Sequence, residues 1–139
     1  MKSFYIDSDL NKDPFEVLQY SALALAFVGD AVHSLYVRTR LVLVKDIKVN
    51  DLQKKTSSVV RATSQSGFLE SVMDTLSDDE IALVRRARNT HTNNIAKSAT
   101  AKEYKLSTAF EALIGYLYLS GQVERMNRFL EKSFEEKVC

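Results

Sequence analysis

Residues 108–119 read TAFEALIGYLYL, an almost wholly apolar run. A helix with this composition has no polar face to turn toward water, so it must be buried nearly all round. Gly121 follows closely and breaks the run, as glycine commonly does after a helix. The stretch therefore predicts a buried helix, around which the other helices pack, with Glu111 as its one charged side chain.

A second long stretch, from about Ser21 to Val44, has apolar residues at helical spacing. One stripe of this helix would contain Leu23, Phe27, Asp30, Ser34, Val37 and Leu41. Gly29 stands in its interior, where glycine costs about 1 kcal/mol relative to alanine and usually has a packing reason. Here Gly29 could let either another helix or a metal site approach closely beside Asp30.

Shorter helices are indicated elsewhere. Asp13 and Ser77 each open a cap pattern, and residues 51–73 suit one or two helices. Thr100 with Glu103 predicts a short helix over 100–105, separate from that at 108–119, and Val123, Met126, Leu130 and Phe134 mark a last amphipathic helix. With only four glycines and one proline in 139 residues, a turn-rich β fold is disfavoured. We expect a single all-α domain at 13–139, preceded by a flexible leader at 1–12.

Composition also excludes several classes of protein. The single cysteine, Cys139, allows no disulfide within the chain, which suits a reducing compartment. The first residues have no apolar segment of a signal peptide, and no run is long enough to span a membrane. Neither a GxxxxGK[ST] nor a GxGxxG loop is present, so nucleotide binding of those kinds is not indicated.

Positive charge is concentrated in one segment, although the net charge is only +1. Residues 84–105 are rich in Asn and Thr and contain one acidic residue, Glu103, against Arg85, Arg86, Arg88, Lys97, Lys102 and Lys105. Such a segment is either a solvated loop or a surface that binds phosphates.

Asp30 and Glu111 are the candidate chemical groups. Asp30 lies either on an exposed helix edge or in a site, since burying an unpaired carboxylate is costly. Glu111 has two interpretations: it completes a capping box with Thr108, or it faces a partner in the core. Two carboxylates on two buried helices would make a minimal site for Mg²⁺, which binds few protein carboxylates and keeps waters and substrate phosphates. His33, three residues after Asp30, either lines that site or lies on the helix surface.

The two carboxylates lie in strings that resemble a known family. LALAFVGDAVHSLYVR and FEALIGYLYLSG resemble the two signature helices of the ribonuclease III catalytic domain, with RRARN at 85–89 between them. The similarity covers roughly residues 13–135 and is closest to mini-ribonuclease III, the short form without a double-stranded-RNA-binding domain. Asp30 matches the aspartate of the GDA string, and Glu111 matches the glutamate of the FEALIG string.

The resemblance implies a ribonuclease III-like helical bundle that forms a homodimer and cuts double-stranded RNA with Mg²⁺, for which Mn²⁺ could substitute. It implies a cytoplasmic enzyme that matures the large-subunit (23S) ribosomal RNA precursor, with a ribosomal protein as a candidate partner. Asp30 and Glu111 would be the catalytic and metal residues. The expected RNA contacts are Arg85, Arg86, Arg88, Asn89, Lys97 and Lys102.

The chain departs from full-length ribonuclease III in its acidic residues. Leu23 to Ala26 and Thr108 stand where that enzyme has further acids, so the expected site is lean in charge. Two alternatives remain at this point: a non-catalytic helical homodimer that binds structured RNA or the ribosome, and a helical interaction protein with no RNA role.

Overall fold

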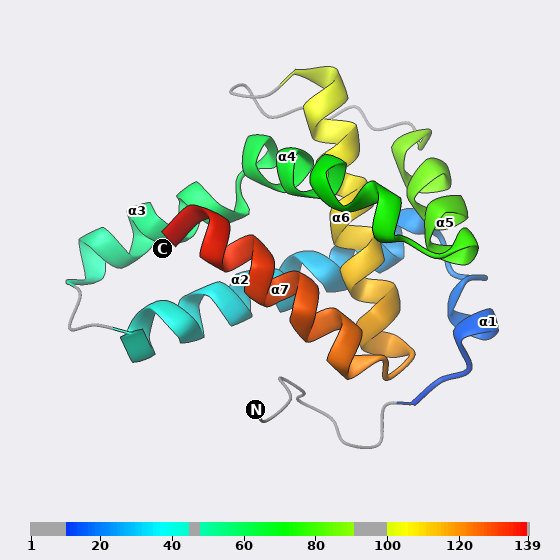
Figure 1. Cartoon of the computed structure of the whole chain (residues 1–139), viewed down its shortest axis with the longest axis horizontal. Helices are drawn as coiled ribbons and strands as arrows, with labels where there is room; N and C mark the ends of the chain where they lie inside the picture. Colours follow the sequence, from blue (N-terminus) through cyan, green and yellow to red (C-terminus); the bar gives the residue numbers. More distant parts are fainter. Residues whose placement is uncertain (1–10, 45–47, 91–99, 139) are drawn as a thin grey trace.

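The computed structural model describes residues 11–44, 48–90 and 100–138 of the chain. All regular elements in these ranges are helices, which confirms the predicted all-α class. In chain order they are α1 (Pro14–Val17), α2 (Ala22–Val44), α3 (Val49–Val60), α4 (Ala62–Val72) with the short 3-10 turn η1 (Met73–Thr75), α5 (Asp78–Arg88), α6 (Ala101–Leu119) and α7 (Val123–Val138) (Figure 1).

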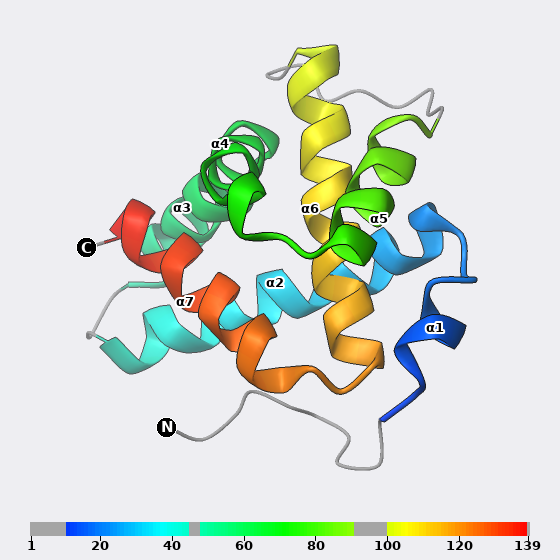
Figure 2. The same cartoon turned by 45° about the vertical axis from the view of Figure 1, so that its right-hand side comes forward.

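Helix α6 is the central element. It crosses α2 and lies between α4 and α5, which pack against it from different sides (Figure 2). From Leu106 to Tyr118 every residue of α6 except Glu111 is buried, including Phe110, Leu113 and Ile114. The apolar run of the sequence is therefore the buried helix it was expected to be.

One boundary prediction was wrong, because residues 100–119 form one continuous helix instead of two. Thr100 caps its start in the predicted capping box with Glu103. Thr108, expected to start a second helix, lies inside α6, where its hydroxyl donates to the carbonyl of Tyr104 at 3.1 Å. A threonine inside a helix commonly satisfies its hydroxyl by bonding to the carbonyl four residues earlier, and the helix continues through Thr108. At the other end Gly121 adopts a φ of 70°, the left-handed conformation that ends the chain's helical path.

The stripe predicted on α2 is buried only toward its C-terminal half. Val37 and Leu41 are fully buried, whereas Phe27 is 81% exposed and Leu23 is 45% exposed. The exposed residues turn away from α6, because the helix meets its neighbours on a different face there. Periodicity identified the helix, but it did not identify which face meets the core.

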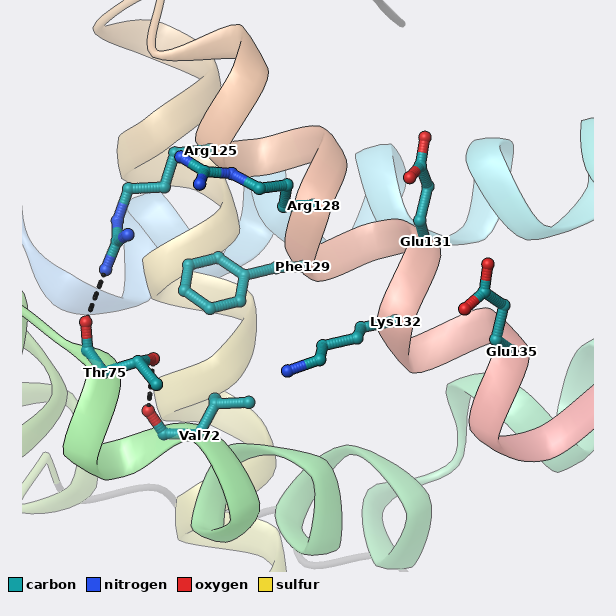
Figure 3. Close-up of a pocket in the computed structure, with 8 residues that line it drawn as sticks. All are labelled: Val72, Thr75, Arg125, Arg128, Phe129, Glu131, Lys132 and Glu135. Carbon is teal, nitrogen blue, oxygen red and sulfur yellow. Dashed lines mark hydrogen bonds between the residues drawn. The ribbon is translucent and has the colours of Figure 1, made fainter. Parts of the chain in front are cut away.

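A partly buried ion pair joins α5 to α7. Ser77 and Glu80 form the predicted capping box, and the carboxylate of Glu80 also accepts two bonds of 2.6 Å from Arg125. Burial raises the pKa of Glu80, but the bonds from Arg125 and Ser77 outweigh it and hold the pKa below its usual value. Arg125 also donates to the carbonyl of Thr75 and stacks over Phe129, 5.0 Å from the ring centre, at the edge of a hollow between α4 and α7 (Figure 3).

Two expectations fall partly outside the described residues. The leader expected at 1–12 is described only from residue 11, where the backbone N–H of Lys12 donates to the carbonyl of Leu119 at 3.2 Å. Much of the loop expected at 89–99 also lies outside the described ranges. Among the described helices, none combines the length and apolar character that crossing a membrane requires.

Candidate active site

The crossing of α2 and α6 is built on two glycines. A β-carbon at Gly29 would overlap the carbonyl oxygen of Glu111, and one at Gly115 would overlap the carbonyl oxygen of Leu25. Because both positions lack a side chain, the two helix backbones touch. This contact places Asp30, the residue after Gly29, beside Glu111 on the facing helix.

Asp30 and Glu111 form a pair of carboxyl groups at this crossing. Asp30 is exposed to solvent, whereas Glu111 is only partly exposed between buried neighbours. Burial raises the pKa of Glu111 to about 9. The hydrogen bond that protonated Glu111 donates to Asp30, and the charge of Asp30, act in the same direction. The predicted pairing of two residues 81 positions apart is therefore present, and one of the two retains a proton at neutral pH.

The capping-box interpretation of Glu111 is excluded. Thr108 lies within α6 and bonds to Tyr104, so there is no helix start for Glu111 to cap. The capping role at the true start of α6 belongs to Glu103. Glu111 instead faces α2 and α4, where its partners are Asp30 and Gln65.

Gln65 connects the carboxyl pair to the core. This residue of α4 is 1% exposed, and its hydrogen bond to Glu111 lowers the pKa of that group against the larger effects of burial and Asp30. The hydroxyl of Ser107 donates to Gln65 Oε1 at 2.8 Å, and Gln65 Nε2 lies 3.0 Å from His33 Nδ1. Three helices, α2, α4 and α6, therefore contribute to one polar cluster inside an apolar core.

His33 belongs to this cluster and not to the helix surface. Its side chain is fully buried and packs edge-on against Phe110, with ring centres 5.0 Å apart. Burial lowers the pKa of His33 to about 4, although the charge of Asp30 opposes the shift. The ring is thus neutral at pH 7, which excludes a role as a cation in RNA binding.

Gln65 was not predicted from the sequence, because it stands among small polar residues in a stretch without a clear apolar stripe. The one feature of the sequence that could have identified Gln65 is its residue type. Glutamine is rarely buried without partners, and the neighbouring Ser64 and Ser66 are buried as well.

The predicted RNA-binding residues are brought together only in part. Arg88 and Asn89 at the end of α5 meet Lys102 at the start of α6, and with Lys105 they line a pocket of about 290 Å³. Arg85 is exposed on α5, and Arg86 donates to the carbonyl of Tyr20 at 3.2 Å, which ties it to the segment before α2. Lys97 lies outside the described residues.

This basic pocket does not adjoin the carboxyl pair of the same chain. Lys102 and Glu111 lie nine residues apart on α6, which corresponds to about 14 Å along the helix and a rotation of about 180°. Lys102 therefore lies on the opposite side of α6 from Glu111, and the pocket that it lines with Arg88, Asn89 and Lys105 is displaced from the carboxyl pair.

The carboxyl pair has the chemistry of a site for a hard cation. Its donors are all oxygens, which suit Mg²⁺ and Mn²⁺ better than soft metals. In the described ranges no three His, Cys, Asp or Glu residues gather closely enough to form a complete metal cage. A cation at this pair would therefore keep most of its coordination for water and for an anionic substrate. The proton that Glu111 retains marks the position where a cation would relieve the same repulsion.

Comparison with known proteins agrees with the two sequence motifs. Residues 23–122 match the family model described as the ribonuclease III domain, which spans both Asp30 and Glu111. The chain is 45% identical over 119 residues to the mini-ribonuclease 3 of Thermoanaerobacter sp. (strain X514), covering 86% of this chain and 84% of that protein. It is 36% identical over 132 residues to the mini-ribonuclease 3 of Clostridium tetani, covering 94% and 86% respectively.

A solved structure has the same arrangement of helices. The crystal structure of a protein from Fusobacterium nucleatum matches with a TM-score of 0.78 and 31% sequence identity. The match covers 86% of this chain and 96% of that one.

Proposed function

Since this chain belongs to the ribonuclease III family and is an endoribonuclease that acts on double-stranded RNA, we propose that Asp30 and Glu111 are its catalytic carboxylates. The observation that carries the proposal is their contact at the crossing of α2 and α6. Burial and Asp30 raise the pKa of Glu111 to about 9 there. Perturbed carboxyl pairs of this kind are concentrated at functional sites.

Enzymes of this family use a divalent metal ion, and we assign the pair to hold it. Mg²⁺ is the expected ion because few protein ligands are available and all are oxygens, and Mn²⁺ should replace it. Such an ion polarises a phosphoryl oxygen and neutralises the charge that develops during hydrolysis.

The two carboxyl groups have unequal tasks in this proposal. Asp30 is exposed and can meet both the ion and the RNA backbone. Glu111 lies deeper than Asp30 and has a hydrogen bond with Gln65. It would therefore bind the ion on the side that faces the helix crossing. Gly29 and Gly115 keep the two groups in contact by allowing the helices to touch.

A homodimer is the proposed assembly. Leu23, Phe27, Ala31 and Leu35 recur every four residues along α2 and are all exposed. Phe15 on α1 adds another exposed apolar side chain. A second copy covering this face would bury it, and would bring two carboxyl pairs together for the two strands of a duplex.

The RNA duplex is proposed to contact the basic pocket of Arg88, Asn89, Lys102 and Lys105, with Arg85 and Lys97 adding charge. A-form RNA presents phosphates and 2′-hydroxyls to a protein, and these groups suit cationic and amide side chains. Because the pocket does not adjoin the carboxyl pair of its own chain, it would bind the duplex at a distance from the phosphodiester bond that is cut.

The proposed cellular substrate is the 23S ribosomal RNA precursor in the cytoplasm, with a ribosomal protein as a possible partner. The support is the close similarity to proteins named mini-ribonuclease 3. Mapping the ends of 23S ribosomal RNA in cells with and without the gene would test this assignment, and unchanged ends would contradict it.

The catalytic proposal is tested with a duplex RNA, Mg²⁺ and two isosteric variants. Asp30→Asn and Glu111→Gln should each lower cleavage by orders of magnitude, while each variant stays folded and binds duplex RNA in Ca²⁺. Glu70→Gln, an exposed acid on α4, is the matched control and should cleave at the wild-type rate. Cleavage by the wild type should stop when the metal is chelated. Near-normal cleavage by Glu111→Gln would return Glu111 to a structural role.

A further inference from the structure

The amide of Gln65 lies at the centre of a buried polar cluster, with partners on two other helices. Ser107 on α6 donates to its Oε1 at 2.8 Å, and its Nε2 lies 3.0 Å from Nδ1 of His33 on α2. A side-chain hydrogen bond from Gln65 also lowers the pKa of Glu111, and the second hydrogen of Nε2 is the donor that such a bond requires. Gln65 therefore has a defined partner for each of its polar atoms.

These partners select one of the two orientations of the amide. Turning the amide by 180° would point its carbonyl oxygen at the carboxyl group of Glu111, where two acceptors would repel. In the present orientation Oε1 accepts from Ser107, and the two hydrogens of Nε2 suit His33 Nδ1 and the carboxyl group of Glu111. His33 is neutral, so its Nδ1 is free to accept.

We propose that Gln65 is a positioning residue for Glu111, and that His33 and Ser107 act by fixing the orientation of the Gln65 amide. One oxygen of Glu111 is held toward α4 by the amide N–H, which leaves the other oxygen facing Asp30. The inference rests on the proposed function of the Asp30–Glu111 pair as the metal site. It adds three residues that set the geometry of that site without touching the RNA.

A purely structural interpretation of Gln65 makes a different prediction. A buried glutamine could serve only as the hydrogen-bond partner of Ser107 and His33 inside the core. Its loss would then change the stability of the protein without changing its affinity for metal. Partners that orient a metal ligand typically contribute tenfold to hundredfold in metal affinity. The affinity for metal therefore separates the two roles.

The experiment titrates the chain with Mn²⁺ in the absence of RNA and measures the affinity for Mn²⁺ by calorimetry. Gln65→Leu keeps the approximate size of the side chain and removes its polar atoms, so it should bind Mn²⁺ at least about tenfold more weakly. Ser107→Ala should give a smaller loss in the same direction. Ser64→Ala is the matched control: it is also a buried serine, next to Gln65 on α4, but it bonds to the carbonyl of Ser58 and should bind Mn²⁺ like wild type.

A pair of substitutions at His33 tests its part in the cluster. His33→Asn can place an acceptor oxygen close to the position of Nδ1, whereas His33→Leu has none. Both remove the ring that packs on Phe110, so they should lose similar stability. We expect His33→Asn to retain more of the Mn²⁺ affinity than His33→Leu does.

The kinetics provide a second readout. At limiting Mg²⁺ Gln65→Leu should lower kcat with little change in KM for duplex RNA, and raising Mg²⁺ should restore much of the rate.

Wild-type affinity for Mn²⁺ in a folded Gln65→Leu protein would overturn the inference while leaving the catalytic proposal intact. Unchanged Mn²⁺ binding in Asp30→Asn and Glu111→Gln would instead overturn the catalytic proposal itself. Should Gln65→Leu fail to fold, Ser107→Ala and the His33 pair decide the matter, and equal affinity throughout would reject the positioning role.

Discussion

Gly29 and Gly115 face each other across the crossing of α2 and α6, and neither has room for a β-carbon. The carbonyl oxygens of Glu111 and Leu25 occupy the space where those carbons would lie. Close contact between two helix backbones thus has a direct chemical result. It brings the carboxyl group of Asp30 to that of Glu111, although the two residues are far apart in the sequence.

Substituting Gly29 with alanine should damage both stability and activity. The added methyl group would force the helices apart, and overpacking of this kind costs about 1–3 kcal/mol or more. Cleavage should fall further than the loss of stability explains, since Asp30 and Glu111 would separate. Denaturant unfolding and cleavage of duplex RNA are the measurements.

Gly67→Ala is the control for that substitution. Gly67 lies inside α4, and nothing approaches within 4 Å of the position of its missing β-carbon. Alanine there should stabilise the protein by about 0.5–1 kcal/mol through its helix preference and should leave cleavage unchanged. Equal effects of the two substitutions would contradict the importance of the helix crossing.

The stability of the metal-free protein should decrease as the pH rises from about 5 to about 9. Burial, followed by the hydrogen bond and charge of Asp30, raises the pKa of Glu111 to about 9 in the folded chain, against about 4.3 for an unperturbed glutamate. Between these values the folded state holds a proton that the unfolded state has lost. The contribution is complete below the unfolded pKa and is lost as the pH rises through the folded one, with a slope of up to about 1.4 kcal/mol per pH unit.

Glu111→Gln should remove most of this slope and make the metal-free protein more stable than wild type near pH 8. Glu103→Gln provides the comparison, because that residue caps α6 and glutamine can replace glutamate in a capping box. The measurement is urea unfolding across the pH range with a chelator present. Parallel profiles for wild type and Glu111→Gln would mean that Glu111 does not titrate as described.

The exposed stripe of α2 should mediate a homodimer. Phe27 is 81% exposed in the single chain, and Phe27→Glu would place a charge in the centre of the proposed contact. Sedimentation should show a dimer for the wild type and a shift toward the 15.7 kDa monomer for the variant. Leu43→Ser, which removes an equally exposed apolar side chain near the other end of α2, should leave the dimer intact. A wild-type monomer that retains full activity would refute the assembly.

The basic pocket should control RNA affinity and not chemistry. Arg88→Gln combined with Lys102→Gln should weaken binding to duplexes of different sequence and flatten its dependence on salt. The slope falls by about 0.9 per lost phosphate contact in duplex DNA, and a similar scale is expected for duplex RNA. The single-turnover rate at saturating RNA should change much less, because the carboxyl pair is untouched.

A salt titration of duplex binding in Ca²⁺ measures this effect. Lys54→Gln combined with Lys55→Gln removes the same charge from α3, where both residues are exposed. If the slope changes in the α3 variant and not in the Arg88 and Lys102 variant, the duplex lies along α3 and α4 instead.

Much of the fold, and the two carboxylates that we propose as catalytic, could be identified from local sequence. The apolar run at 108–119 requires burial on every side, and the cap patterns at Ser77 and Thr100 depend on residues within one turn. Gly29 and Asp30 are adjacent, so a close approach and a carboxylate could be inferred together. The strings around Asp30 and Glu111 were sufficient for the family, because each motif is contiguous in the chain.

The tertiary structure alone decided which groups meet and which faces are buried. The contact of Glu111 with Asp30, and the cluster of Gln65, Ser107 and His33, join three helices whose packing no local pattern encodes. Periodicity likewise could not distinguish the buried half of the α2 stripe from its exposed half at Phe27. Helical spacing reports only relations between residues on the same helix, whereas burial and a perturbed pKa depend on atoms that neighbouring helices bring from distant parts of the chain.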